Sequence, residues 1–247
     1  MATGRSAIVL AAGKGKRMKS DLPKVLHQIN RRAMICLVMD TLESLGFDRI
    51  IVVIGYQGEL VQRKLADRNV SFVWQREQLG TGHAVMMAKA ALADFDGITL
   101  VALGDMPFVS VDSFRRLLET HERAGAVATC LSAILPDPTE YGRIVRVPDS
   151  DLLQEIVEHR DAAPDVLKIR EINTGAFCFD NRELYAALDK VGTQNTQKEY
   201  YLTDTIKIMH DRGLKVAVVT TSNPDEGLGV NSIDQLEELA RKFAEKC

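Results

Sequence analysis

The sequence predicts an α/β fold built on a doubly wound, mostly parallel sheet, and three features lead to that prediction. Short, continuous apolar runs rich in β-branched residues alternate with segments of helical periodicity. These runs are apolar on both faces, which is typical of parallel strands covered by helices on each side. No stretch rich in Gly, Ser or Pro separates an independent unit. We therefore expect one domain over residues 1–247, assembled from βαβ units.

The first half of the chain supplies four of the predicted strands. They are expected at residues 6–11, 49–54, 70–74 and 98–103. A helix is expected over residues 33–45, with Gly46 as its C-terminal stop, and another over residues 84–92. Leu60, Val61 and Leu65 give helical spacing between the second and third strands. Strands and helices thus alternate regularly up to about residue 110.

The second half, about residues 111–230, shows a more mixed pattern. Strands are expected at residues 126–135, 142–147 and 172–179, with turn-rich segments at 136–140 and 161–164. Residues 231–247 are expected to form a C-terminal helix. Its apolar residues, Leu236, Leu239, Ala240 and Phe243, recur at the spacing of one helix face. The two halves are therefore expected to share one sheet and to end in an amphipathic helix.

Composition and charge exclude several classes of protein. The net charge of −3 gives no basic footprint for nucleic acid, and no apolar stretch approaches the length of a membrane span. The first residues lack the apolar core of a secretory signal. The four cysteines are far apart and form no Cys-x-x-Cys pair: Cys36, Cys130, Cys178 and Cys247. We expect a cytoplasmic protein with free thiols and without nucleic-acid or membrane partners, and leave its oligomeric state open.

A Gly- and Lys-rich loop follows the first predicted strand, where open α/β sheets place their ligands. It reads Leu-Ala-Ala-Gly-Lys-Gly-Lys-Arg-Met over residues 10–18 and Asp-Leu-Pro-Lys over residues 21–24. Gly13 and Gly15 let backbone amides approach an anion closely, and Ala11 and Ala12 leave room beside a planar base. The loop is therefore predicted to bind a phosphorylated nucleotide.

The basic residues of the loop suit phosphate in different ways. Arg17 can bind phosphate oxygens in bidentate fashion, whereas Lys24 acts as a point charge that Pro23 presents on a stiffened chain. A dinucleotide fingerprint fails because its third glycine is replaced by Met18, and the P-loop string is absent. A solvated basic surface loop is the alternative for this run taken alone.

Further strings narrow the interpretation, and their order matters more than any one of them. They are Gln75 with Gln-Leu-Gly-Thr-Gly-His-Ala at residues 78–84, Gly-Asp at 104–105, Tyr-Gly-Arg-Ile at 141–144, Ile-Val-Glu at 156–158, Ile-Asn-Thr-Gly at 172–175, Glu-Tyr-Tyr-Leu-Thr-Asp at 199–204 and Gly-Val-Asn at 229–231. With the loop, this set resembles the sugar-1-phosphate nucleotidyltransferases, and within them the uridyltransferase domain of bacterial N-acetylglucosamine-1-phosphate uridyltransferases. The resemblance covers essentially the whole chain and implies the Rossmann-like nucleotide-diphosphosugar transferase fold.

The resemblance implies a nucleotide-binding role for the first half, about residues 1–110. Lys24 is expected to contact the phosphates and, with Arg17, to be catalytic. The expected nucleotide contacts are Leu10, Ala11, Ala12, Gly13, Lys24, Gln75, Gly80, Thr81, Leu103, Gly104 and Asp105. Among them Gln75, Gly80 and Thr81 are expected to face the uracil. Gln75 alone does not select uracil, because its amide can be placed in either of two orientations.

The resemblance also implies a metal site and a sugar-phosphate site. Asp105 and Asn231 are expected to hold Mg²⁺, which prefers one or two protein oxygens together with water and substrate phosphates. The second half is expected to bind the sugar phosphate, through Gly142, Glu158, Asn173 and Asn231. Thr203 and Asp204 are taken as scaffold. His27, His83 and His159 receive no catalytic role, because a phosphate nucleophile is already an anion at neutral pH.

The implied reaction transfers a uridylyl group from UTP to a sugar-1-phosphate, most specifically N-acetylglucosamine-1-phosphate, and releases pyrophosphate. The chain departs from the family at Leu103, where Tyr or Ser is usual before or near Gly-Asp, and the run Gly-Asp-Met-Pro at 104–107 is reminiscent of molybdopterin-type enzymes. The resemblance is to the uridyltransferase domain without the acetyltransferase half of the bifunctional family members, and whether the sequence to Cys247 is a natural single-function protein or a truncated bifunctional one is left open. A different base, a different acceptor (another sugar-1-phosphate, a polyol phosphate or molybdopterin) and a non-catalytic nucleotide-sugar sensor are the alternatives.

Overall fold

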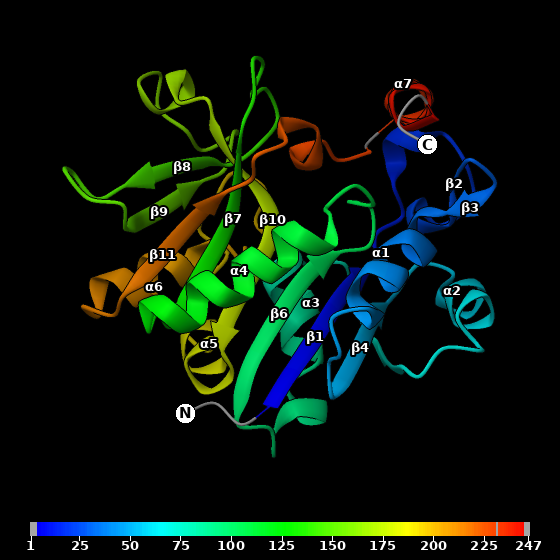
Figure 1. Ribbon diagram of the computed structural model, residues 1–247, viewed down its shortest axis with the longest axis horizontal. Helices are drawn as coiled ribbons and strands as arrows, with labels where there is room; N and C mark the ends of the chain where they lie inside the picture. Colours follow the sequence, from blue (N-terminus) through cyan, green and yellow to red (C-terminus); the bar gives the residue numbers. More distant parts are fainter. Residues whose placement is uncertain (1–3, 231, 245–247) are drawn as a thin grey trace.

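A nine-stranded sheet runs through the molecule in the computed structural model, which describes residues 4–230 and 232–244. Seven strands follow one path in the order β11-β7-β10-β6-β1-β4-β5, and β8 and β9 form a hairpin attached to β10 (Figure 1). The first half of the chain supplies β6, β1, β4 and β5, and the second half supplies β10, β7 and β11. The prediction of a doubly wound, mostly parallel sheet is confirmed.

The first half follows the alternation that the sequence predicts. Its strands are β1 (Gly4–Ala11), β4 (Arg49–Ile54), β5 (Ser71–Trp74) and β6 (Gly97–Leu103). All four are parallel, with β1 between β4 and β6. A short two-stranded sheet, β2 (Gln28–Ile29) and β3 (Arg32–Ala33), lies outside the main one. The continuous apolar runs become parallel strands because both of their faces are buried.

Helices cover the two faces of the sheet in two sets. One apolar cluster joins one face to α1 (Met34–Glu43), α2 (Gly58–Lys64) and α4 (Val111–Ala124). A second cluster joins the other face to α3 (Thr81–Met87), α5 (Asn181–Leu188) and α6 (Asp204–Asp211). Alternate residues of β1 divide between them, with Val9 in the first cluster and Ile8 in the second. This division is what makes the fold doubly wound.

The second half adds strands of both directions. β7 (Ala128–Ile134) and β11 (Val216–Thr220) are parallel to each other, whereas β10 (Glu171–Asp180) is antiparallel to both β6 and β7. The hairpin of β8 (Arg143–Arg146) and β9 (Leu153–Val157) pairs with β10 through Ile172 and Arg143. Because β10 is reversed, its first residues lie at the edge where the parallel strands end.

Several boundaries differ from those predicted. The helix predicted over residues 84–92 is α3. It begins at Thr81 rather than at residue 84, because Gly80 takes a positive φ of 112° and caps the helix there. It ends at Met87, and Ala90–Leu92 form a separate 3₁₀ turn. The other 3₁₀ turns are Lys16–Met18, Lys24–Leu26, Val166–Lys168 and Pro224–Gly227. The predicted C-terminal helix is α7 (Ile233–Ala244), and the side chain of Phe243 lies outside the described residues.

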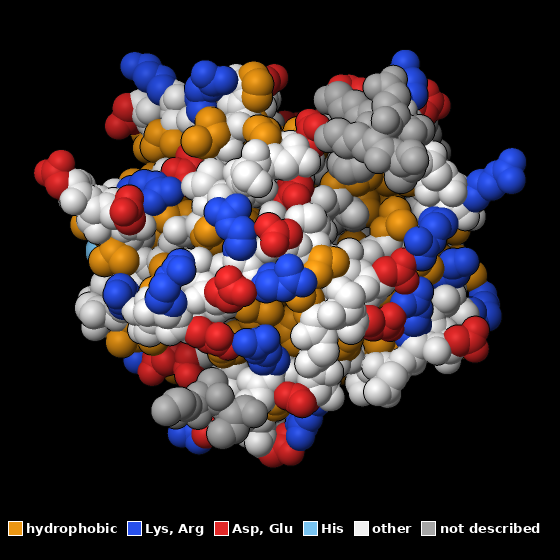
Figure 2. All heavy atoms as spheres, viewed as in Figure 1, with side chains coloured by type: hydrophobic (Ala, Val, Ile, Leu, Met, Phe, Trp, Pro, Cys, Tyr) orange, Lys and Arg blue, Asp and Glu red, His pale blue; other side chains and the backbone are white. Residues whose placement is uncertain are grey.

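The surface carries charges of both signs. On the face shown in Figure 2, Lys and Arg side chains alternate with Asp and Glu over α4 and its surroundings. Among the described helices, none is long and apolar enough to cross a membrane. Cys36, Cys130 and Cys178 are buried free thiols.

A buried histidine links α4 to the sheet. His121 is 4 % exposed, and its Nδ1 lies 3.0 Å from Oγ1 of Thr129 on β7. Burial lowers the pKa of His121 to about 4, although the charges of Asp180 and Glu122 act weakly in the opposite direction. His121 is therefore neutral in the folded protein over most of the working range of pH.

This histidine is expected to make the fold sensitive to acid. Its pKa is near 4 when folded and near 6.5 when unfolded, so as the pH falls from 7 to 4 the unfolded chain takes up a proton first. The free energy of unfolding should fall by about 2–3 kcal/mol over this window from His121 alone. Urea unfolding of His121→Gln should show a correspondingly weaker pH dependence than wild type. Equal slopes in the two proteins would contradict this origin.

Candidate active site

The candidate site lies where the parallel strands end, as open α/β sheets require. The loops after β1, β5 and β6 meet the first residues of β10 there. The smaller cavity, of about 270 Å³, and the larger cavity, of about 350 Å³, adjoin each other and share Thr81, Leu103 and Asp105. A third, of about 550 Å³, surrounds the glycine loop. The site is therefore a set of connected hollows along one edge of the sheet.

The glycine loop folds over Lys24. Gly15 has a φ of +68°, and a Cβ atom there would stand 2.7 Å from Cβ of Lys24. Only glycine meets both the left-handed backbone and the close contact without strain. Gly13 is exposed with open space around it, which leaves its backbone accessible to a ligand. Gly15 therefore permits the packing of Lys24, and together with Gly13 it lines the third cavity.

An ion pair between Lys24 and Asp105 joins the loop to the end of β6. The side chains are 13 % and 22 % exposed, so neither charge is fully solvated. The backbone N–H of Val230 donates to the carbonyl of Asp105 at 3.4 Å, which brings the Gly229–Val230 segment beside it. Asn231, the second predicted metal ligand, lies outside the described residues. Of the predicted metal pair, the structure therefore describes Asp105 alone.

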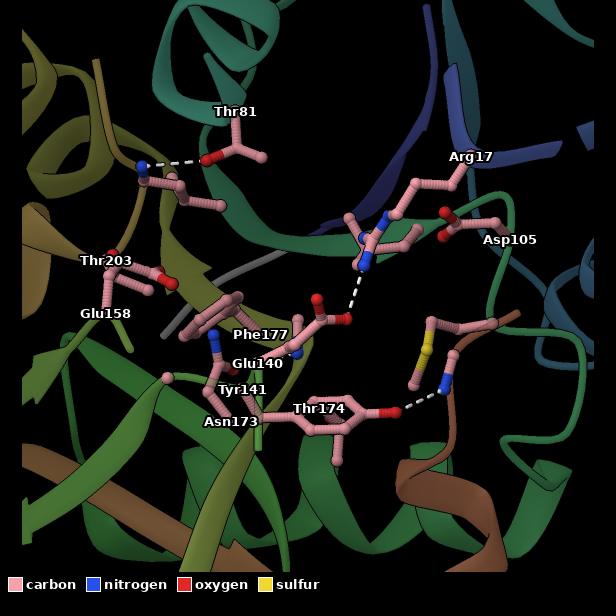
Figure 3. Close-up of a pocket in the computed structure, with 16 residues that line it drawn as sticks. Arg17, Thr81, Asp105, Glu140, Tyr141, Glu158, Asn173, Thr174, Phe177 and Thr203 are labelled. Atoms are coloured by element: carbon pink, nitrogen blue, oxygen red, sulfur yellow. Dashed lines mark hydrogen bonds and ion pairs between the residues drawn. The ribbon is translucent and has the colours of Figure 1, made fainter. Parts of the chain in front are cut away.

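A second ion pair joins Arg17 of the loop to Glu140 of the second half. Figure 3 shows it across the middle of the larger cavity, with Asp105 on one side and Glu158, Thr203 and Asn173 on the other. Both side chains of the pair are more than half exposed. Water screens such a pair, so a ligand that carries phosphate can displace Glu140 at low cost.

The smaller cavity has the lining expected for a planar base. Most of the predicted nucleotide contacts line it, namely Leu10, Ala12, Gly13, Gln75, Gly80, Thr81, Leu103 and Asp105. Gly104 adjoins it through its N–H, which donates to the carbonyl of Leu10 at 2.9 Å. Ala11 instead points into the apolar cluster beneath α1. The alternation of side chains along β1 explains why Ala11 and Ala12 face opposite ways.

Leu103, the residue at which the chain departs from its family pattern, lines both cavities. Its side chain lies against the backbone of Gly175 on β10, where a Cβ atom would collide with it. Leu103 therefore separates the base-sized cavity from the second half by apolar packing and offers no hydrogen bond to a nucleotide.

The larger cavity has polar groups suited to a sugar. Glu158 accepts a hydrogen bond from Oγ1 of Thr203 at 2.9 Å, and burial raises the pKa of the Glu158 carboxyl. Oδ1 of Asn173 accepts from the N–H of Gly175 at 2.8 Å, which leaves its Nδ2 as the group able to donate into the cavity. Gly142 adjoins both, because its carbonyl accepts from the N–H of Asn173 at 2.9 Å.

Several lining residues were not predicted from the sequence. Thr203, expected to be scaffold, lines the cavity and holds Glu158. Tyr141 accepts from the N–H of Gly229 at 3.1 Å and so ties the second half to the segment beside Asp105. Glu140 pairs with Arg17, and Tyr56 packs its ring under Nζ of Lys14 at 4.8 Å. Thr203 and Tyr141 lie inside the sequence motifs named above, so the sequence did point to them. Nothing in the single sequence points to Glu140 or Tyr56.

Comparisons with known proteins agree with this geometry. The model of the MobA-like NTP transferase domain matches residues 7–171, about two thirds of the chain. "Bifunctional protein GlmU" of Halalkalibacterium halodurans is 45% identical over 97% of this chain and 53% of its own length. The protein of that name from Heliobacterium modesticaldum is 48% identical over 95% of this chain and 51% of its own length. The chain spans about half the length of the curated relatives it matches.

A solved structure supports the fold independently. A UDP-glucose pyrophosphorylase, complexed with UDP-glucose, superposes with a TM-score of 0.78 at 15% identity and covers 99% of this chain and 100% of its own. At that identity the likeness establishes the fold. The family rests on the sequence, and the resemblance inferred from the ordered motifs is confirmed. The chain belongs to the MobA-like NTP transferase family of nucleotidyltransferases.

Proposed function

We propose that this chain transfers a uridylyl group from UTP to N-acetylglucosamine-1-phosphate, giving the UDP-sugar and pyrophosphate. The observation that carries the proposal is that Asp105, which is paired with Lys24, lines both a base-sized cavity and a cavity lined by Glu158 and Asn173. About residues 1–110 would hold the nucleotide and about 111–230 the sugar phosphate. The identity of 45% to a GlmU over nearly the whole chain supports the choice of substrates.

The chemistry needs positioning more than proton transfer. A sugar-1-phosphate oxygen attacks the α-phosphorus of UTP in line, and the bond to the pyrophosphate oxygen breaks, with no covalent intermediate on the protein. The attacking oxygen is already anionic, so no general base is required. Lys24 and Arg17 hold phosphate oxygens and offset the charge that develops on them, while the two cavities fix the base and the sugar on opposite sides.

The residues present fit a magnesium ion. Asp105 offers a carboxylate beside the predicted phosphate positions. Its side chain is partly buried, so a bound cation would compete with few water molecules for the carboxylate oxygens. Mg²⁺ typically takes one or two protein oxygens and completes its shell with water and phosphate oxygens. Asp105 would hold the ion, with Asn231 as the second proposed ligand. The ion would supply charge neutralisation at the α-phosphate.

A different acceptor is the second candidate. The run Gly-Asp-Met-Pro at residues 104–107 and the MobA-like family model both leave other nucleotidyl acceptors open. A non-catalytic nucleotide-sugar sensor is less favoured, because a sensor has no need of the proposed metal ligands Asp105 and Asn231. Glu158 with Thr203 and Asn173 provides hydrogen-bonding groups for hydroxyl and acetamido substituents, which favours the sugar.

A substrate panel tests the proposal directly. Pyrophosphate release should be measured with each nucleoside triphosphate against several sugar-1-phosphates, a polyol phosphate and a molybdopterin-type acceptor, with Mg²⁺ and with a chelator. We expect turnover with UTP and N-acetylglucosamine-1-phosphate that disappears on chelation. Turnover with another acceptor would replace the proposed substrate, and ligand binding without any pyrophosphate release would favour the sensor.

The ion pair gives a sharper prediction about roles. Lys24→Met and Asp105→Asn should each lower kcat/KM by about 10²–10³, the usual effect of losing one group that stabilises developing charge. Each variant also removes one ion pair from a partly buried charge, which lowers stability. The double variant removes both charges, so its melting temperature should recover while its activity does not. Recovery of activity along with stability would show that the pair is structural.

The sugar cavity gives a prediction about binding. Glu158→Gln keeps the size of the side chain but weakens it as an acceptor for sugar hydroxyls, so KM for the sugar-1-phosphate should rise about tenfold. KM for UTP should change little, because Glu158 lines the larger cavity and not the base-sized one. Glu155→Gln, on β9 three residues before Glu158 and outside both cavities, is the matched control. A rise in KM for UTP instead would contradict the placement of the sugar.

A further inference from the structure

The side-chain amide of Gln75 is held on two sides. Gln75 follows the end of β5, is 3 % exposed, and lines the base-sized cavity. Its Nε2 lies 3.0 Å from the carbonyl oxygen of Gly80 and 3.1 Å from Nδ1 of His83. An amide nitrogen carries two hydrogens, so these two acceptors use its donor capacity completely.

The orientation of this amide follows from what its neighbours can do. The carbonyl of Gly80 can only accept, so turning the amide over would place Oε1 against another oxygen at about the same separation. Nδ1 of His83 must likewise accept from Nε2, which puts the imidazole proton on Nε2 of His83. Of the two orientations open to an isolated glutamine, the site admits one.

The group that enforces this choice is itself fixed. Gly80 has a φ of +112°, and a Cβ atom there would stand 2.5 Å from the carbonyl oxygen of Tyr200. The N–H of Gly82 donates to that same oxygen at 2.8 Å, and the N–H of Tyr200 donates to the carbonyl of Leu79 at 2.8 Å. His83 follows on α3, with its ring centroid 6.2 Å from that of Tyr200. The turn at Gly80 is thus fixed against Tyr200, and its carbonyl also accepts from the N–H of Ala84 at 3.1 Å.

We propose that His83 is a positioning residue which, together with the carbonyl of Gly80, locks Gln75 so that only its carbonyl oxygen can read the base. Among the described residues none donates to Oε1 of Gln75, so this oxygen is the polar atom left for a ligand in the cavity. A fixed acceptor pairs with the N3–H of uracil. With cytosine, Oε1 of Gln75 would face N3, which is also an acceptor, so the two atoms repel each other. The inference rests on the proposed use of a pyrimidine triphosphate and explains how one amide can distinguish UTP from CTP.

Equilibrium binding tests the lock without turnover. Titration calorimetry should compare UTP, CTP and N3-methyl-UTP, each with Mg²⁺, on wild type, His83→Leu and His83→Asn. Wild type should bind UTP about ten- to a hundredfold more tightly than either of the other two, since both lack the N–H that Oε1 accepts. His83→Leu removes one of the two acceptors that hold Nε2, so the Gly80 carbonyl alone restrains the amide and Oε1 faces the base less often. The preference for UTP over CTP should fall about tenfold in this variant.

The conservative variant separates positioning from structural support. Oδ1 of Asn can accept near the place of Nδ1, so His83→Asn should keep the preference within about threefold of wild type. His210→Leu replaces another half-buried histidine, on α6 and away from the cavities, and should leave the preference unchanged. If His83→Leu fails to fold, His83→Phe, which keeps a planar ring but offers no acceptor, takes its place with the same expected loss of preference.

The outcomes for the lock and for the proposed function are distinguishable. An unchanged preference in a folded His83→Leu, or equal binding of UTP and N3-methyl-UTP by wild type, overturns the lock while uridylyl transfer can still be observed. Tight, selective binding of UTP without pyrophosphate release upholds the lock and overturns the proposed reaction. Binding of none of the three nucleotides overturns both.

Discussion

The parallel hydrogen-bond ladder of β6, β1, β4 and β5 determines where the loops of the first half, with Lys24, Gln75 and Asp105, begin. It continues past the ends of the strands: the N–H of Gly104 donates to Leu10, that of Tyr56 to Ala12, and that of Gln75 to Ile54. Each loop therefore begins from a fixed backbone rather than from a free strand end. A site built on such a frame needs little reorganisation when a ligand arrives, which is the condition under which charged groups stabilise a reaction well.

The reversed strand β10 brings the second half to the same edge. Because β10 is antiparallel to β6, Asn173 and Gly175 lie beside the end of β6, opposite Leu103 and near Asp105. The register of β10 against β7 shifts between Asn173 and Phe177, and a bulge of this kind redirects side chains at the rim of a sheet. Here it accompanies the turn in which Oδ1 of Asn173 accepts from Gly175. Asn173, a proposed sugar contact, thus lies at an irregularity of the sheet.

Much of this arrangement could be predicted from the sequence, and the remainder has definite physical causes. The strands of the first half and the loop with Lys24 were predictable because doubly buried parallel strands and Gly-rich turns leave local patterns. The pairing of Arg17 with Glu140 was not, because the residues are 123 positions apart and neither pattern specifies the other. The amide of Gln75 was ambiguous for the same reason: the carbonyl that orients it becomes a neighbour only through the turn at Gly80. The sequence showed which chemical groups are present, whereas the fold decides which of these groups contact one another.

The place of β6 in the sheet has a consequence for how such enzymes diversify. β6 pairs with β1 on one side and β10 on the other, so the strands of the first half meet those of the second half along this single strand. Changes in the hairpin β8–β9 or in the bulge of β10 can alter which acceptor fits without disturbing the frame around Gln75. An ancestral scaffold could in this way keep one donor nucleotide while its descendants recruit new acceptors, and a protein engineer can exploit the same independence.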